Sequence, residues 1–286
     1  MGMTTFPTLP PAGPVALLRT LFKGASAQEA PAQIATTFRL DRIDARQLVR
    51  YNALLGFAPD ALPVSFYYLP TQRAHLATLL GQAFPHRVAG MIHVENDLSE
   101  LGQPDRNLPM ELATHVVMEA PTKSGAQFCE LLTAGTQQGS PIFECRSRYL
   151  AVRGKQRARS GTRSGGTPGK EAGAAQPNGL MAGEWSLAAD TGRRYAAVSG
   201  DWNPIHLWPW TARLLGMKTP IIHGMHTVGR VCAELERQEG KRLTGITARF
   251  KAPVQLGSQA ELRLADAGGS YQVWADGKLA VEGSWR

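Results

Sequence analysis

An acid and an imidazole lie five residues apart in the second half of the chain, at Asp201 and His206. Residues 199–206 read Ser-Gly-Asp-Trp-Asn-Pro-Ile-His, so that Asn203 and Pro204 stand between them. Proline fixes its own φ angle and keeps the preceding residue out of helical geometry, which predicts a sharp turn. Such a turn can bring a carboxylate and an imidazole to one small volume, where both can transfer protons near neutral pH. The same pattern also fits a purely structural turn, in which Asp201 and Asn203 bond to backbone and His206 caps the next helix.

A second feature follows downstream, where residues 220–225 read Pro-Ile-Ile-His-Gly-Met. Apolar residues recur at helical spacing from Met225 to Leu235, which predicts a helix over residues 224–236 that opens on Gly224. The free N–H groups at a helix N-terminus carry partial positive charge, and a glycine there lets a ligand approach closely. They can stabilise negative charge on a carbonyl oxygen, as an oxyanion hole does. An acid–base pair beside such donors suits the reversible addition of water across a double bond conjugated to a thioester.

The two halves of the chain resemble each other. The Leu-Leu-Gly at residues 79–81 parallels that at residues 214–216, and other matched positions keep a similar offset. A steady offset indicates a duplicated domain. In this alignment residues 67–73 stand opposite residues 200–206, and the first copy retains a proline there without an acid or an imidazole. We therefore expect one active site per chain, in the second copy.

Each copy is predicted to form a helix followed by antiparallel strands. The first copy offers a helix over residues 44–55, then a run over residues 88–96 and strands from residue 113 to residue 150. In the second copy the helix is followed by four short, partly alternating runs, and Asp276-Gly277 between the last two predicts a hairpin. A helix packed on an antiparallel sheet is an α+β arrangement. The four runs are residues 243–250, 259–265, 271–275 and 279–285.

The net charge of +8 is concentrated in one segment. Residues 152–179 contain six Lys and Arg residues against Glu171 alone, and they are rich in Gly, Ser, Thr and Ala. Such a composition cannot bury enough apolar surface to become ordered, which predicts a solvated linker between domains at residues 1–151 and 180–286. Nucleic-acid binding and attraction of an anionic substrate are the other uses of this charge, and we expect no nucleic-acid partner.

The remaining composition favours a cytoplasmic protein. The three cysteines form no CxxC pair and are odd in number, which favours reduced thiols over a disulfide framework. No apolar run approaches the roughly 20 residues that span a bilayer. Residues 1–14 lack the basic start and apolar stretch of a signal peptide. We therefore expect a cytoplasmic location and no membrane partner.

Residues 195–206, followed by residues 220–225, resemble the signature of the MaoC-like dehydratases, which include the (R)-specific enoyl-CoA hydratases. The resemblance implies a double hotdog fold, in which two long helices are each wrapped by an antiparallel sheet and the first copy is degenerate. It implies reversible hydration of trans-2-enoyl thioesters to (R)-3-hydroxyacyl thioesters in fatty-acid metabolism. The thioester would be an acyl-CoA, or an acyl group on a carrier protein, and we expect a homodimer.

The resemblance also assigns roles to residues of the second copy. Asp201 and His206 would activate the water and shuttle protons, and Asn203 would support them. The amide of Gly224 would hold the thioester oxygen. The first copy would complete the pseudo-dimer and accommodate the acyl chain.

Four further residues are candidates for substrate binding. Ser199 precedes the turn, and Trp208 lies in a segment that could flank the acyl chain. Arg249 and Lys251 are the best-placed bases of the second copy for a CoA phosphate. Bases on a strand surface are more often simply solvated, and tryptophans more often pack than bind ligands, so these structural readings stay open.

A metal site is the remaining possibility near the turn. His223 and His226 lie three residues apart and could bind a metal together with Asp201 or His206. Gly224 between them, and the lack of a further ligand motif, argue against it. We therefore expect neither a metal nor another cofactor.

Two other classes of function share this fold. A hotdog acyl-CoA thioesterase would place its acid differently, so the Asp-x-Asn-Pro-x-His turn argues against it. A non-catalytic acyl-thioester-binding protein is expected to lose the acid and imidazole, as the first copy has. Since Asp201 and His206 are both present, a hydro-lyase is the favoured function.

Overall fold

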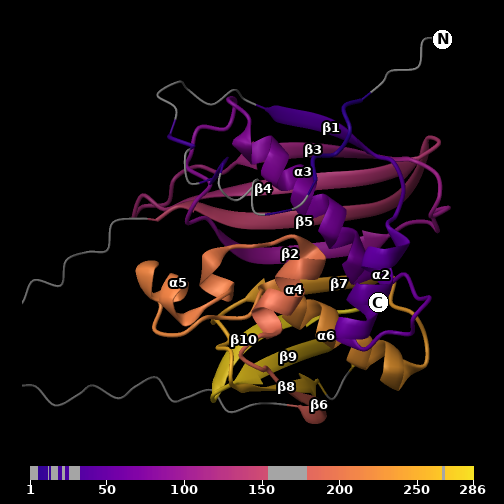
Figure 1. Cartoon of the computed structure of the whole chain (residues 1–286), viewed down its shortest axis with the longest axis vertical. Coiled ribbons are helices and arrows are strands. Elements are labelled where there is room, and N and C mark those ends of the chain that lie inside the picture. The colour runs from indigo at the N-terminus through magenta and orange to yellow at the C-terminus, as the bar shows by residue number, and fades with distance from the viewer. Residues whose placement is uncertain are drawn as a thin grey trace, which may run out of the picture.

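The computed structural model describes residues 6–11, 13, 19–20, 23–25, 33–153, 179–265 and 268–286. The described elements fall into two copies with the same order of strand, helices and four strands (Figure 1). The first copy comprises β1 (Ile34–Leu40), α2 (Ala45–Leu55), the 3-10 turn η1 (Val64–Tyr67), α3 (Tyr68–Leu80), β2 (Ile92–Glu100), β3 (Met110–Met118), β4 (Gln127–Gln137) and β5 (Ser140–Val152). The second comprises β6 (Leu180–Ser186), α4 (Thr191–Ser199), the 3-10 turn η2 (Pro204–His206), α5 (Pro209–Leu214), α6 (Gly224–Glu239), β7 (Gly245–Phe250), β8 (Gln259–Leu264), β9 (Ser270–Ala275) and β10 (Lys278–Ser284).

The strands form one ten-stranded sheet in the order β1-β3-β4-β5-β2-β7-β10-β9-β8-β6. The two halves of this order mirror each other about the antiparallel β2–β7 pair, which runs from Glu95 opposite Arg249 to Ser99 opposite Gly245. Each copy therefore contributes five strands, and the backbone bonds between β2 and β7 join them into a continuous sheet. This arrangement confirms the double hotdog fold that the family resemblance implies.

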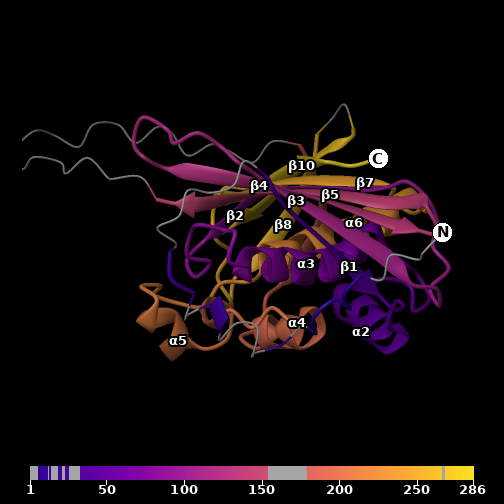
Figure 2. The ribbon, with the colours of Figure 1, turned by 90° about the horizontal axis from the view of Figure 1, so that it is seen from above.

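The helices of the described residues cover one face of the sheet, and none of them lies on the other face (Figure 2). Strand β3 shows the consequence, because Met110, Leu112, Thr114 and Val116 are buried and the residues between them are more exposed. Buried apolar side chains from both copies belong to one cluster, which extends from Leu9 to Val281 in the sequence. The two copies thus share a core, and the helix layer over it positions the candidate site.

The structure corrects the residue alignment between the copies. By position in the sheet and order along the chain, α2 corresponds to α4 and α3 corresponds to α6. The helix predicted at residues 44–55 is therefore real, but it is not the counterpart of the long helix of the second copy. Residues 214–216 lie at the end of α5, an element without a counterpart in the described residues of the first copy. The alignment with residues 79–81 was wrong because the second copy has a longer connection before its long helix.

Glycine caps identify the true counterpart of the Asp201 turn. Gly56 ends α2 with φ 91°, and Gly200 ends α4 with φ 81°, both in the left-handed region that glycine adopts without strain. Gly56 is followed by Phe57, whereas Gly200 is followed by Asp201. The first copy therefore does lack the acid, although at a different position from the one aligned on sequence.

The long helix of the second copy and the strands after it agree with the sequence predictions. The helix predicted over residues 224–236 is confirmed as α6, and the four predicted strands after it are confirmed as β7 to β10. Positive φ angles at Asp276 and Gly277 form the predicted hairpin. The predicted linker lies largely outside the described residues, which resume at Gly179. None of the helices in the described part of the chain combines the length and apolar character needed to cross a membrane.

The helix α3 escaped prediction for a physical reason. Its buried residues include Tyr68, Leu69, Pro70 and Thr71, which are consecutive and so occupy all sides of the helix. Because α3 is enclosed between the sheet and the other helices, its sequence shows no single apolar stripe.

Candidate active site

A glycine cap and two short-range hydrogen bonds fold residues 199–206 into a compact turn. Gly200 reverses the chain at the end of α4, and Oδ1 of Asp201 then accepts the backbone N–H of Asn203 at 3.1 Å. Oδ1 of Asn203 accepts the N–H of Ile205 at 3.4 Å, and the proline after it opens η2. The side chain of Asn203 therefore supports the turn, as predicted. The result is that Asp201 and His206 lie on the same side of one turn.

The loop before α6 fixes the imidazole of His206. Its Nδ1 lies 2.9 Å from the carbonyl oxygen of Ile221, so Nδ1 carries the proton and Nε2 is left as the basic nitrogen. His223 lies against it, with the two ring centroids 3.7 Å apart, and its Nε2 donates to the backbone carbonyl of Asp201 at 2.9 Å. His223 thus packs against His206 and bonds to the turn.

A carboxylate oxygen of Asp201 and one ring nitrogen each of His206 and His223 lie within 4.8 Å of one another. The imidazoles of His206 and His223 are buried, and Asp201 is half-buried. This separation leaves room for one water molecule to bond both the carboxylate and an imidazole nitrogen. The turn therefore gathers the acid and the imidazole as the sequence predicts.

The surroundings keep the carboxylate charged. Burial alone raises the pKa of Asp201, but the neighbouring His223 and His206, the N–H of Asn203 and the amide of Gln72 together hold that pKa below its usual value. Hydrogen bonds to the charged form of an acid always act in this direction. Asp201 is therefore ionised at neutral pH.

The same burial keeps the imidazoles neutral. Loss of solvent lowers the pKa of His206, and only Asp201 and the bond to Ile221 oppose this effect. Burial and the nearby His206 lower the pKa of His223 to about 3. At neutral pH the site thus combines a carboxylate anion with a neutral imidazole whose Nε2 can accept a proton.

Helix α6 begins beside this pair. Its first residue is Gly224, whose N–H has no hydrogen-bond partner among the described residues. A Cβ atom at this position would stand only 2.6 Å from the Phe250 ring, so the close packing of helix on strand requires glycine. The helix N-terminus therefore presents a free donor close to His223, which can stabilise a developing oxyanion.

Two predicted substrate-binding residues have structural contacts of their own. The buried hydroxyl of Ser199 accepts the N–H of Asp201 at 3.2 Å, which helps to shape the turn. Trp208 precedes α5 and is 38% exposed; its ring stacks on Trp210, and the guanidinium of Arg193 lies 5.9 Å from its centroid. Contact of either residue with a substrate stays a prediction.

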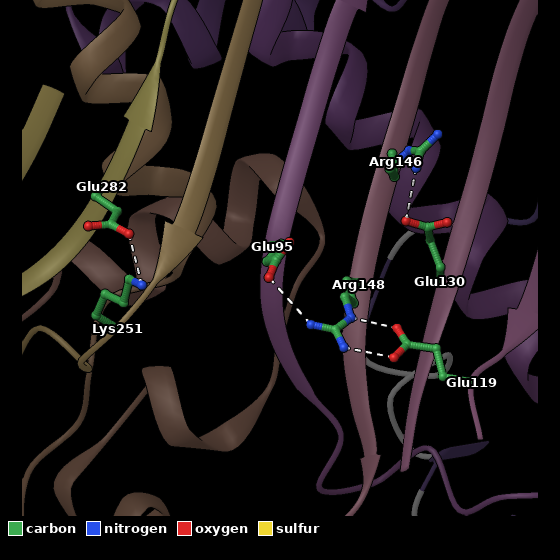
Figure 3. A network of polar contacts seen from close by, with 7 residues as sticks. All are labelled: Glu95, Glu119, Glu130, Arg146, Arg148, Lys251 and Glu282. Atoms are coloured by element: carbon green, nitrogen blue, oxygen red, sulfur yellow. Dashed lines mark hydrogen bonds and ion pairs between the residues drawn. The ribbon is translucent and has the colours of Figure 1, made fainter. Parts of the chain in front are cut away.

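The other two, Arg249 and Lys251, are not brought to the site. Along β7 the buried residues Ile246 and Ala248 face the helices, and Arg249 alternates with them on the exposed face of the sheet. Lys251 forms an ion pair with Glu282 at 2.8 Å, beside a cluster in which Arg148 bonds Glu119 and Glu95 (Figure 3). A role for Arg249 or Lys251 in binding CoA stays a prediction that the position of neither residue supports.

The Asp201 carboxylate and the imidazoles of His206 and His223 are also chemically suited, and close enough together, to bind a metal ion. His206 and His223 each use one nitrogen for a carbonyl oxygen, which leaves one nitrogen on each ring. The two rings are tilted at 30° to each other, with their centroids 3.7 Å apart. The absence of a metal requirement stays a prediction.

One contact was missed by sequence reasoning. Nε2 of Gln72, in helix α3 of the first copy, donates to Oδ2 of Asp201 at 2.8 Å. The two residues are 129 positions apart, and no local pattern connects them. Only the packing of α3 beside the turn reveals this contact.

Comparisons with known proteins identify a family for the second copy and similar folds for most of the chain. Residues 171–280 match the family model described as MaoC like domain. The chain is 26% identical over 235 residues to 3-hydroxyacyl-thioester dehydratase X of Mycobacterium tuberculosis, an alignment that covers 81% of this chain and 80% of the relative.

Solved structures show the same fold. The crystal structure of HtdX from Mycobacterium tuberculosis has a TM-score of 0.66 at 23% identity and covers 87% of this chain and 99% of that chain. Another protein of that organism, described as having a double hotdog fold, has a TM-score of 0.55 at 14% identity over 93% of this chain and 96% of that chain. Fold and site together define a double hotdog protein with one carboxylate–imidazole pair. Residues 171–280 thus carry a MaoC-like domain.

Proposed function

We propose that the protein is a hydro-lyase that adds water to trans-2-enoyl thioesters and removes it from 3-hydroxyacyl thioesters. The observation that supports this most directly is the juxtaposition of Asp201 and His206 within 4.8 Å, beside the free N–H at the start of α6. The name of the relative, 3-hydroxyacyl-thioester dehydratase X, supports the same reaction class.

The proposed reaction conserves protons within the site. A water molecule between Asp201 and His206 gives one proton to Nε2 of His206 as its oxygen bonds to C3 of the enoyl group. The electrons of the double bond move onto the thioester oxygen, which the N–H of Gly224 stabilises as an enolate. The proton on His206 then returns to C2 as the carbonyl re-forms. The product gains OH at C3 and H at C2, and dehydration is the reverse.

The Asp201 carboxylate has two roles in this proposal. It accepts a hydrogen bond from the second O–H of the water and so orients the water oxygen toward C3. Its negative charge also stabilises the imidazolium that forms on His206 during the reaction. Neither role requires Asp201 to take up a proton, which agrees with the lowered pKa of its carboxyl group.

Finer features of the function are also proposals. The (R) configuration at C3 and the use of acyl-CoA instead of an acyl carrier protein follow from the family resemblance alone. A homodimer and a cytoplasmic location are likewise predictions from the sequence.

A spectrophotometric assay tests the function. Purified protein is mixed with trans-2-enoyl-CoA of several chain lengths, and the loss of the conjugated thioester absorbance is followed. Asp201→Asn and His206→Ala are expected to lower kcat about 10²- to 10⁴-fold, because each removes a proton-transfer or orienting group. Asp190→Asn, at the start of α4, and His115→Ala, on the exposed side of β3, change the same residue types elsewhere and should retain activity.

Three results would count against the proposal. One is the absence of hydration at every chain length, and another is full activity in both site variants. Release of free thiol without loss of the double bond would indicate the thioesterase instead.

A further inference from the structure

The carboxylate of Asp201 is held from two directions. Its Oδ1 accepts the N–H of Asn203 within the turn, and its Oδ2 accepts the side-chain amide of Gln72 at 2.8 Å. The first bond belongs to the second copy and the second bond comes from the first copy. Among the described residues these are the hydrogen bonds that orient the carboxyl group.

A neutral donor is suited to this position. An arginine or lysine in hydrogen-bond contact would form an ion pair with Asp201 and neutralise the charge that stabilises an imidazolium on His206. A glutamine amide fixes the oxygen without adding charge. The adjacent cation of α3 is held elsewhere, because the guanidinium of Arg73 donates to the carbonyl oxygens of Leu9 and Pro10 at 3.0 and 2.9 Å.

The corresponding turn of the first copy has no acid, and the long helix beside it makes a different contact. There α6, the counterpart of α3, sends Arg230 to the backbone carbonyl of Leu55 at 2.9 Å, directly before Gly56. Arg230 neutralises no carboxylate of that turn, because Phe57 follows Gly56 there, whereas Asp201 follows Gly200 in the second copy. The contact between long helix and turn is therefore present in both halves, but only Gln72 makes it to a carboxylate.

We propose that Gln72 is a positioning residue for the Asp201 carboxylate, so that the degenerate first copy supplies part of the single active site. This inference rests on the proposed function. By fixing Oδ2, Gln72 holds the carboxylate plane in the orientation that directs the bound water toward C3. The first copy thus contributes to catalysis through one amide, in addition to its share of the core.

Two variants and a matched control test this role. Gln72→Leu removes the amide and keeps a side chain of similar size, and is expected to lower kcat about tenfold or more with little change in KM, as for other bonds to charged groups. Gln72→Glu places a second carboxylate beside Asp201, so the pair shares a proton and the acidic limb of the kcat profile moves to higher pH. Gln47→Leu is the control, because Gln47 of α2 also donates across the copies, to the carbonyl of Val198 at 2.7 Å, without touching the carboxylate.

The outcomes separate this role from a structural one. If Gln72 only packs α3 against the turn, Gln72→Leu, which keeps the packing volume, should retain the wild-type kcat, or Gln47→Leu should be impaired as much as Gln72→Leu. Either result, with thermal unfolding showing all variants folded, would overturn the positioning role while the proposed function stands. A wild-type protein without hydratase activity would overturn the proposed function, and this inference with it.

Discussion

The chemistry at Asp201 and His206 depends on a difference between a half-buried carboxyl group and a buried imidazole. Each has lost part of its contact with water, which disfavours the charged form of each. The carboxylate regains stability from the N–H of Asn203 and the amide of Gln72, whereas the imidazole has only one carbonyl partner. As a result the acid is charged and the imidazole is neutral at the same pH.

This difference predicts the pH dependence of the reaction. Burial places the pKa of His206 below the ordinary imidazole value of about 6.5, so its Nε2 remains free to accept a proton at that pH and above. We expect kcat/KM to be constant from about pH 8 to pH 6.5 and to fall only at lower pH. The measurement is kcat/KM across this range, with samples returned to pH 7.5 to confirm that the loss is reversible. An acidic limb centred above pH 7 would contradict the assignment.

The residues of the site differ in how far sequence could predict them. Asp201, Asn203 and His206 lie within six positions, and the geometry of proline and of left-handed glycine nearly determines their turn. His223 could be placed only generally, because its partner is a backbone carbonyl of another loop. The contact between Gln72 and Asp201 could not be predicted from the sequence, because it exists only after the two copies pack together. The alignment of the repeats also paired Gln72 with a different residue of the turn.

At the scale of elements, the start of α6 depends on a close approach between helix and strand. Gly224 and Gly229 lie on the same helix, and a Cβ on either would stand 2.6 Å from a neighbouring carbon, of Phe250 and of Leu55 respectively. The two positions are therefore crowded to the same degree. Only Gly224 is next to the free N–H groups of the candidate oxyanion hole.

We expect Gly224→Ala to lower kcat/KM about 10- to 100-fold, because displacement of the helix start by a fraction of an ångström misplaces its donor. Gly229→Ala is the control. Each substitution is expected to change the free energy of unfolding by no more than about 1–3 kcal/mol, as overpacking does. Enzyme kinetics and chemical denaturation of both variants provide the check. Equal activity in the two variants would argue against a role for the N–H of Gly224.

Helices and strands could be predicted from the sequence where one of their faces is exposed to solvent and the other packs on the core. This holds for α2, whose N-cap Asp44 accepts the N–H groups of Arg46 and Gln47, and for α6 and the strands after it. It fails for α3, which is enclosed on most sides, and for the edge strands β1 and β6. The correspondence of the copies also needed the structure, because the connection that contains η2 and α5 shifts every later position.

At the scale of the whole molecule, buried histidines couple stability to pH. Burial lowers the pKa of His75, His223 and His226 to about 3 and that of His93 to about 4. In the unfolded chain these side chains take up protons near pH 6.5. The folded state therefore binds fewer protons between pH 6.5 and about 4, and its stability falls as the pH falls through this window.

Below pH 6.5, where the unfolded chain binds the proton, each of these histidines is expected to lower the free energy of unfolding by about 1.4 kcal/mol for each unit by which the pH falls. We predict a steep loss of stability between pH 6.5 and 4.5, measured by urea unfolding at several pH values. His226→Gln removes one of the four imidazoles. His226 is chosen because its Nδ1 has no hydrogen-bond partner among the described residues. This variant should show a shallower pH dependence. A stability that is constant or rises over this window would contradict the prediction.

The seam between β2 and β7 has a consequence for how the two copies can diverge. In a dimer of identical short chains every substitution occurs twice, so a residue that serves one site must also be tolerated at the other. Here both halves of the sheet belong to one polypeptide, and each position is inherited separately. Phe57 can therefore replace an acid in one half while Asp201 remains in the other, and α3 and α6 can carry Gln72 and Arg230 for different tasks. Covalent joining thus permits the two halves to specialise.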